Sequence, residues 1–409
     1  MKIIYLHQYF IFPNEPGGTR SYDLALGFLR SGHNVEIISS TSNPKYKNDD
    51  SRWMMVKKNG LVVHYTYLPY SNSLSFKDRI IIFFKFLVFS SIKIINLKAD
   101  LVLATSTPLT IGVPALLNKW LRKTPFIFEV RDVWPEAPIA VGAIKNRAIK
   151  KILFYLEYLI YKNATAIVPL SKDMRYSIFS RYPDFKKKPV EVIENISEID
   201  RFQFGYSHDI SLLTSKIGFK PRFSILYAGA FGKVNGLNYV VELANKLIKI
   251  DPSIVFILIG EGYEKKSVIK NAKAMNVINK NLFILDSISK EDLPQIYYEC
   301  DMGSSYVIPI IELWANSANK FFDTLAAKKP ILINYEGWQK ELIQKENIGF
   351  VLPPNLNSIQ SIRNFVKYTH DDKLIHLQKE NAIRIAKEKY STNVAVEKYN
   401  KIFKIIKTQ

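Results

Sequence analysis

Short apolar runs alternate with stretches of helical spacing through the first half of the chain. The first run covers residues 2–6 and leads into a loop, after which helical spacing continues until Gly32. Short apolar runs separated by helices are typical of parallel strands that are buried on both faces. We therefore expect a first parallel sheet, with strands over residues 2–6, 35–38, 61–67, 101–104, 126–129, 166–169 and 190–193.

The same pattern begins again after a polar connector over residues 198–220, which lacks strong periodicity. Gly229 follows the next apolar run, and a helix is expected from Leu237 to about Ile250. The tail, from about residue 382 to residue 407, has helical spacing without a strand. This second set predicts strands over residues 224–228, 255–259, 281–285, 302–307 and 330–334.

Two successive strand–helix sets predict an α/β protein with two Rossmann-like, doubly wound domains. We expect these domains at residues 1–200 and 201–381, followed by a C-terminal helix over residues 382–409; a length of 409 residues suits this division. Open parallel sheets bind ligands beyond the carboxyl ends of their strands. If those ends face each other, the site is a cleft between the domains.

Composition narrows the classes of protein without choosing among them. A hydrophobic content of 47% with 23% charged residues is typical of a globular chain, and the single Cys300 excludes an internal disulfide framework. The formal net charge of +20 is compatible with a phosphate-bearing substrate, an anionic membrane surface or nucleic acid. Solvated surface charge explains it equally well, because lysines occur throughout the sequence.

One apolar stretch raises the question of a membrane. Residues 80–95 are rich in Ile and Phe, but Lys85 and Lys93 interrupt them, so we expect no segment to cross a bilayer. The wider stretch from Lys77 to Lys98 is apolar nearly all round a helix, with lysines between the apolar positions. This pattern favours partial insertion at an anionic membrane surface over a helix buried in the first domain.

Several catalytic signatures are missing from the sequence. The six histidines show no metal-ligand spacing, and the Asp-x-Asp clamp of one class of sugar transferases does not occur, so we expect no obligatory metal. The sequence also contains no Gly-x-Ser-x-Gly elbow, no Gly-Lys-Ser/Thr phosphate loop and no complete Gly-x-Gly-x-x-Gly. These absences disfavour a hydrolase, a P-loop ATPase and an ordinary dehydrogenase.

The loop after the first strand runs from His7 to a paired glycine and the start of a helix. Gly17 and Gly18 let backbone N–H groups approach a ligand, and the helix N-terminus that begins with Thr19 and Arg20 favours anions. An ordinary glycine turn is the alternative.

The second domain opens on a similar loop, in which Gly229 follows the first strand and Lys233 comes shortly after it. The same physical argument predicts an anion there. Gly260 and Gly262, after the next strand, are equally consistent with a turn and with a ligand loop.

Charged residues cluster after the apolar run over residues 126–129. Arg131, Asp132 and Glu136 lie at the expected carboxyl end of that strand, where charged groups can hydrogen-bond sugar hydroxyls. A structural Arg–Asp pair buried beneath Trp134 explains the cluster equally well.

The densest polar cluster begins at Glu312. A helix beginning near Ser317 would place Asn319, Lys320 and Asp323 on its first turns. A helix N-terminus with a lysine can hold a diphosphate, and an aspartate can accept hydrogen bonds from both hydroxyls of a ribose. The alternative is a capped helix with an ordinary Lys320–Asp323 pair.

Together, these motifs resemble the GT-B, family 4 retaining glycosyltransferases over nearly the whole chain. The resemblance is greatest for the branch that builds O-antigen and capsular polysaccharides, which includes N-acetyl-L-fucosaminyl transferases. It rests on the order and spacing of the His7-to-Arg20 loop and of residues 131–136, 192–195, 227–229, 256–262 and 319–330.

The resemblance implies that the second domain binds the donor, that the first holds the acceptor, and that the C-terminal helix returns to the first domain. It implies ribose contact for Asp323 and diphosphate contact for Asn319 and Lys320. Gly17, Gly18 and Gly229 would lie near the donor, and Arg131 and Asp132 near the transferred sugar. Glu136 is expected beside these two as a catalytic residue, and His7, Thr19 and Arg20 on the acceptor side.

The chain departs from the family in two places. The first glutamate of the family's Glu-x7-Glu motif falls at Ala315, with Glu312 as a candidate substitute. The family's phosphate-binding Arg and Lys fall at Ala230 and Asn235, so that Lys233 or Lys320 would supply the positive charge.

The implied reaction is retaining, metal-independent transfer of an N-acetylated hexosamine or deoxyhexosamine from a UDP-linked donor. The acceptor would be polyprenyl-diphosphate-linked, in O-antigen or capsule synthesis at the inner face of the cytoplasmic membrane. No cofactor is expected, because the nucleotide sugar is a substrate. A nucleotide-sugar epimerase of the same architecture is the first alternative. A non-enzymatic nucleic-acid binder is the second, although the chain lacks a recognised nucleic-acid-binding module.

Overall fold

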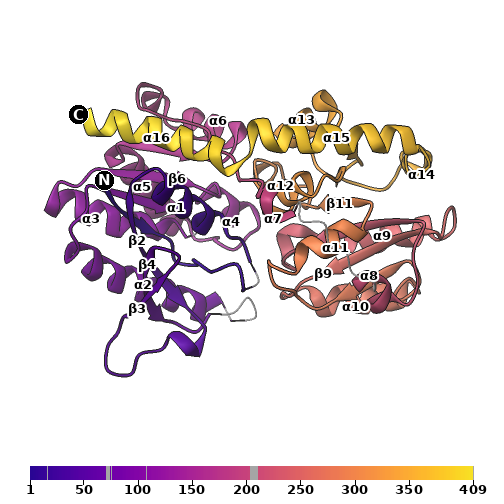
Figure 1. Cartoon of the computed structure of the whole chain (residues 1–409), viewed down its shortest axis with the longest axis horizontal. Helices are drawn as coiled ribbons and strands as arrows, with labels where there is room; N and C mark the ends of the chain where they lie inside the picture. Colours follow the sequence, from indigo (N-terminus) through magenta and orange to yellow (C-terminus); the bar gives the residue numbers. More distant parts are fainter. Residues whose placement is uncertain (16, 71–73, 75, 107, 203–210, 409) are drawn as a thin grey trace.

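The computed structural model describes residues 1–15, 17–70, 74, 76–106, 108–202 and 211–408. Figure 1 shows two α/β lobes side by side, with the C-terminal helices running along one side of both. Residues 203–210, within the expected polar connector, lie outside the described residues. The two Rossmann-like domains expected from the strand–helix pattern are confirmed.

The first domain is built on a seven-stranded sheet in the order β3-β4-β2-β1-β5-β6-β7. Neighbouring strands are parallel except for β3 and β4. Ile3 and Tyr5 belong to the core on one face, and Ile4 and Leu6 to the core on the other, so the sheet is covered on both sides. The strands are β1 (Lys2–Leu6), β2 (Asn34–Thr41), β3 (Met54–Lys58), β4 (Leu61–Tyr67), β5 (Leu101–Thr105), β6 (Phe126–Val130) and β7 (Ala166–Pro169).

Helices from both ends of the chain cover this sheet. One face packs against α1 and α16, where the ring of Phe28 meets those of Tyr399 and Phe403. The other face packs mainly against α2, α3 and α5. The helices are α1 (Arg20–Arg30), α2 (Phe76–Ile95), α3 (Gly112–Arg122), α4 (Glu136–Ala140), α5 (Arg147–Asn163), α6 (Lys172–Arg181) and, at the end of the chain, α16 (Thr392–Thr408).

The second domain has a six-stranded, wholly parallel sheet in the order β10-β9-β8-β11-β12-β13. Its strands are β8 (Phe223–Ala228), β9 (Ile254–Ile259), β10 (Leu282–Leu285), β11 (Met302–Ser305), β12 (Ile331–Ile333) and β13 (Gly349–Val351). Its helices are α8 (Leu212–Ile217), α9 (Asn238–Leu247), α10 (Lys265–Ala274), α11 (Leu293–Glu299), α12 (Asn319–Ala326), α13 (Trp338–Glu346), α14 (Ile359–Tyr368) and α15 (Asp372–Lys389), while α7 (Ile199–Phe202) precedes them.

The predicted single helix of the tail is two helices in the structure. α15 packs on the second domain through Ala382, Ile385 and Ala386, and α16 packs on the first. The chain turns between them at Tyr390, whose carbonyl accepts a hydrogen bond from Ser197 N at 2.7 Å. The tail therefore bridges both lobes, as Figure 1 shows.

One strand prediction is wrong, and two strands were missed. The expected strand over residues 190–193 is only an isolated bridge at Val190. Two strands were not predicted: β3 is an exposed antiparallel edge strand, and β13 is only three residues long. None of the helices in the described part of the chain is both long and apolar enough to span a bilayer.

Candidate active site

Two adjoining cavities lie at the carboxyl ends of strands from both sheets. The larger, of about 510 Å³, is lined by the Gly17–Gly18 loop, by the loops after β8, β9 and β10, and by the start of α12. Gly18, Ala318 and Asn319 line both cavities. The smaller, of about 330 Å³, is lined on its first-domain side by His7, Tyr9, Gly18, Arg131, Asp132 and Leu170.

Helix α12 opens at the junction of the two cavities. It begins at Asn319, two residues later than predicted, because Ser317 bonds to Asn195 instead of capping the helix; Ser317 Oγ accepts from Asn195 N at 3.1 Å. Among the described residues, no side chain caps the N-terminus at Ala318. A helix N-terminus attracts anions, so this end suits a phosphate group.

Lys320 lies over the backbone of Gly229. A Cβ atom at residue 229 would stand 2.8 Å from Lys320 Cε, so glycine leaves room for the lysine. Lys320 Nζ lies 4.9 Å from the centre of the Tyr227 ring, and within the described ranges no acceptor takes a hydrogen bond from it. Burial lowers the pKa of Lys320 to about 8, although Asp323 opposes the shift. Lys320 is thus a cation available to an anionic ligand.

Asp323 forms an ion pair with Lys290, and not the Lys320–Asp323 pair considered as an alternative. Both side chains are buried, both residues line the larger cavity, and Asp323 Oδ2 accepts from Lys290 Nζ. Lys290 Nζ also lies 5.6 Å from the centre of the Phe202 ring. Lys290 therefore fixes one carboxylate oxygen of Asp323, and the other, Oδ1, can accept a ligand hydroxyl.

Arg131 and His7 form a polar wall of the smaller cavity. Arg131 Nη1 lies 3.3 Å from His7 Nε2, and Arg131 N donates to Ser106 Oγ at 2.9 Å. Burial and the charge of Arg131 lower the pKa of His7 to about 3, so the ring is neutral and Nε2 can accept from the guanidinium. Asp132 is exposed and lines the same cavity. This cavity can therefore offer a cation and a carboxylate to sugar hydroxyls.

The Gly17–Gly18 loop closes the larger cavity from the first domain. A Cβ atom at residue 18 would stand 2.1 Å from Asn319 Nδ2, so the absence of a side chain lets the loop contact the start of α12. The loop therefore contacts Asn319 of the second domain, while its approach to a donor stays a prediction.

Thr19 and Arg20 point into the first domain and line neither cavity. Arg20 is only 2% exposed, and its Nη2 donates to Glu129 Oε2 at 2.9 Å. Thr19 Oγ1 donates to Asp23 Oδ2 at 2.7 Å and accepts from Arg201 Nη1 at 2.9 Å. These contacts give both residues a structural role at the start of α1.

Three other predicted residues also lie outside the linings of the two cavities. Glu136 forms an ion pair with Arg181. Glu312 is exposed on a short 3₁₀ turn, and Lys233 Nζ reaches the carbonyl of Val141 at 3.4 Å. The structure thus brings Gly17, Gly18, Gly229, Asn319, Lys320 and Asp323 together at the larger cavity and His7, Arg131 and Asp132 at the smaller.

The sequence did not single out two residues that complete this arrangement. Lys290 is one of many lysines in the chain, and only the fold shows that it reaches Asp323. Asn195 belongs to the 192–195 motif of the family resemblance, but its contacts with Ser317 and Asn319 depend on how the domains meet.

Two family descriptions match successive parts of the chain. Residues 17–201 match Glycosyltransferase Family 4, and residues 213–385 match Glycosyl transferases group 1. A putative colanic acid biosynthesis glycosyl transferase, WcaI of Escherichia coli K12, is 33% identical over 94 residues. That match covers 23% of this chain and 23% of the relative.

Solved structures share the whole fold at low sequence identity. Sucrose-phosphate synthase from Thermosynechococcus elongatus has a TM-score of 0.75 at 12% identity, covering 100% of this chain and 99% of that chain. HepE of Anabaena, in complex with UDP and glucose, has a TM-score of 0.69 at 15% identity and covers 99% of both chains. The two family matches and this shared two-domain architecture identify the chain as a glycosyltransferase of the GT-B fold.

Proposed function

We propose that the enzyme transfers a sugar from a UDP-linked donor to a polyprenyl-diphosphate-linked acceptor in the synthesis of O-antigen or capsule. The proposal rests above all on the gathering of Asn319, Lys320 and Asp323 in one cavity opposite Gly17–Gly18. The UDP complex of HepE supports the nucleotide, and the colanic acid assignment of WcaI supports surface polysaccharide as the product. The family resemblance suggests an N-acetylated hexosamine or deoxyhexosamine as the transferred sugar.

In this proposal the nucleotide occupies the larger cavity. The α12 N-terminus and Lys320 bind the diphosphate, because both present positive charge to it. Asp323 accepts a hydrogen bond from the ribose through Oδ1. The sugar then points toward the smaller cavity, where Arg131 and Asp132 contact its hydroxyls and the acceptor enters.

The proposed chemistry needs no protein nucleophile. The bond between the anomeric carbon and the β-phosphate oxygen breaks, and Lys320 with the start of α12 stabilises the negative charge left on the diphosphate. The acceptor hydroxyl bonds to the anomeric carbon on the same face and gives its proton to the departing phosphate, so the configuration is retained. We propose that these protein groups take the place of a metal ion.

The surface of α2 supports the proposed membrane contact. Ile82, Phe86 and Ile94 pack into the first domain, so one side of the helix is buried. The opposite side is apolar but exposed, at Ile80, Ile81, Phe84 and Ile92. Apolar side chains surrounded by lysines suit insertion among anionic headgroups. We therefore propose that the enzyme works at the inner face of the cytoplasmic membrane, bound peripherally through the Lys77–Lys98 region.

Vesicle flotation tests this membrane contact. Vesicles containing anionic lipid should retain the protein, and high salt should weaken this retention. Phe84→Ser, at the exposed surface of α2, should reduce retention more than Phe86→Ser, at its buried surface, in protein that remains folded. Equal recovery with neutral and anionic vesicles would contradict it.

A ligand panel followed by product analysis tests the activity. We expect UDP-sugars to raise the melting temperature more than GDP- or dTDP-sugars, since a ligand specific for the folded state stabilises it. Addition of the lipid-linked acceptor should then release UDP and produce a longer glycolipid with retained anomeric configuration. Conversion of the donor without acceptor would indicate the epimerase, and binding of duplex DNA without any nucleotide sugar would indicate the nucleic-acid binder.

A further inference from the structure

Asn195 connects the first domain to the start of α12. Its backbone N donates to Ser317 Oγ at 3.1 Å, and its Nδ2 donates to Ser317 O at 3.2 Å and to Asn319 Oδ1. Its Oδ1 accepts from Ile196 N at 3.1 Å. The residue is 3% exposed, so the bonds are shielded from water. Both protons of the amide are therefore directed at the two residues that flank the N-cap of α12.

Asn319 receives this contact at the point where the two cavities meet. It lines both of them, and its side chain also lies against Gly18. Lys320 is the next residue on the same helix turn. A displacement of Asn195 would therefore move the residues that face a ligand diphosphate.

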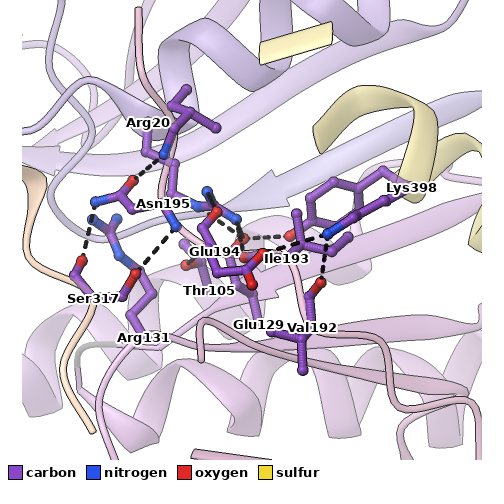
Figure 2. A network of polar contacts seen from close by, with 12 residues as sticks. Arg20, Thr105, Glu129, Arg131, Val192, Ile193, Glu194, Asn195, Ser317 and Lys398 are labelled. Carbon is purple, nitrogen blue, oxygen red and sulfur yellow. Dashed lines mark hydrogen bonds and ion pairs between the residues drawn. The ribbon is translucent and has the colours of Figure 1, made fainter. Parts of the chain in front are cut away.

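The segment before Asn195 is anchored from the opposite side. Arg20 donates to the carbonyls of Ile193 at 3.0 Å and Glu194 at 2.5 Å, and Lys398 of α16 donates to Val192 O at 3.1 Å. Figure 2 shows Asn195 between Ser317 on one side and these anchoring groups on the other. The same segment also bonds to β7, where Glu191 N donates to Ile167 O at 3.1 Å and Ile193 N donates to Pro169 O at 3.2 Å. Pro169 has no N–H to donate back, so the predicted strand over 190–193 is reduced to a bridge.

Arg20 is itself rigidly held. Its partner Glu129 also accepts hydrogen bonds from Thr105 Oγ1 at 2.6 Å and from the hydroxyl of Tyr399 in α16. Burial disfavours a charged carboxylate, but Arg20 and Arg131 more than offset this and lower the pKa of Glu129 to about 2. The ion pair therefore persists at neutral pH, and the anchor joins the sheet, the C-terminal helix and the 192–195 segment.

We propose that Asn195 is a positioning residue for the sugar-nucleotide donor. It transmits the fixed position of the 192–195 segment to Asn319 and the first turn of α12, which places Lys320 against the diphosphate. The inference rests on the proposed function, because it takes the diphosphate to bind at that turn.

A second interdomain hydrogen bond provides a matched control. Ser197 Oγ donates to Phe322 O at 2.9 Å, and Ser197 is as deeply buried as Asn195. The bond joins the same segment to the same helix, but it reaches neither Asn319 nor the residues before the helix. If Asn195 only held the domains together, Ser197→Ala and Asn195→Ala would have similar effects.

The test compares Asn195→Ala, Asn195→Asp and Ser197→Ala as full-length proteins whose melting temperatures show that they are folded. We expect Asn195→Ala to raise the Kd for UDP and the KM for the donor on the order of tenfold, the loss expected from leaving buried acceptors unpaired, with a smaller change in the KM for the acceptor. Asn195→Asp, of equal size, should bind UDP at least as weakly, because a carboxylate would face two acceptor oxygens. Ser197→Ala should change the Kd for UDP by less than about twofold.

Unchanged UDP affinity in both Asn195 variants would overturn the inference, and so would equal losses in Asn195→Ala and Ser197→Ala. Failure of the unaltered protein to bind UDP or another nucleoside diphosphate would instead overturn the proposed function.

Discussion

Lys290 and Lys320 line the same cavity, but their charges are held in different ways. Lys290 is paired with the buried carboxylate of Asp323, so its charge is already neutralised inside the protein. Lys320 lies against the Gly229 backbone and the Tyr227 ring, and burial lowers its pKa to about 8. The difference suggests that Lys290 positions a neighbouring group, whereas Lys320, which forms no ion pair within the described residues, can bind an anionic ligand.

Arg20 and Arg131 in the first domain show a similar contrast. Arg20 is fully enclosed and shares its charge with Glu129. Arg131 lines the smaller cavity and contacts the neutral ring of His7. In both pairs, proximity in sequence to a glycine loop or a helix start does not distinguish the structural cation from the ligand-facing one. The structural cation forms an ion pair with a buried carboxylate, and within the described residues the ligand-facing cation forms none.

The largest expected effect separates the two lysines by activity. Lys320→Met should lower kcat/KM by on the order of 10²–10³-fold, because the diphosphate loses a preorganised positive charge as it departs. Its stability should be unchanged or higher, since a desolvated ammonium is removed. Initial rates and urea unfolding measure both. Full activity in Lys320→Met would show that the charge of Lys320 is not needed for the reaction.

Lys290→Met, unlike Lys320→Met, should destabilise the protein. The free energy of unfolding should fall by about 3–5 kcal/mol, because removal of one partner leaves the buried Asp323 carboxylate unpaired. Lys290→Arg, which keeps the charge, is the matched control. A Lys290→Met protein as stable as the unaltered one would mean that the pair does not fix Asp323.

The arginine pair predicts a contrast in stability. The free energy of unfolding should fall by about 3–5 kcal/mol in Arg20→Met, since Glu129 is left uncompensated, and by far less in Arg131→Met.

The stabilisation from Glu129 should depend on pH. Its pKa of about 2 in the folded protein lies below the usual value of 4.5, so the contribution is present above pH 4.5 and is lost as the pH falls toward 2. Urea midpoints across this range measure the effect, and Glu129→Gln should flatten the acid limb.

The smallest expected effect is a fall in kcat/KM at alkaline pH, the alkaline limb of the pH profile. Above pH 8 Lys320 loses its proton, so kcat/KM should fall by up to roughly tenfold per pH unit if the neutral amine binds the diphosphate poorly. Bound diphosphate favours the ammonium, so the same limb should lie at higher pH in kcat than in kcat/KM. Lys320→Arg should remove the limb near pH 8. A limb that persists in this variant would assign it to another group.

Local patterns were sufficient to predict the sheets and the α12 cluster. Apolar runs located nearly all the strands, and helical spacing put Asn319, Lys320 and Asp323 on one short helix. Such features depend on neighbours within a few residues. The short strand β13 and the edge strand β3 lack a distinctive run. The 190–193 run pairs with β7 only as a bridge, because Pro169 of β7 has no N–H to donate to it.

Long-range pairs could not be read from the sequence. Arg20 meets Glu129 and Lys290 meets Asp323 only after the chain has folded, so their partners carry no local signal. The same applies to Glu136, whose charge is taken up by Arg181. The helical tail was visible, but its division between the two domains follows from the break near Tyr390.

A crystal structure of the 409-residue enzyme with UDP would show where the nucleotide binds. We expect a diphosphate at the first turn of α12, in contact with Lys320, and a ribose hydroxyl on Asp323 Oδ1. Ordered UDP bound elsewhere on the protein, with the larger cavity empty, would contradict it.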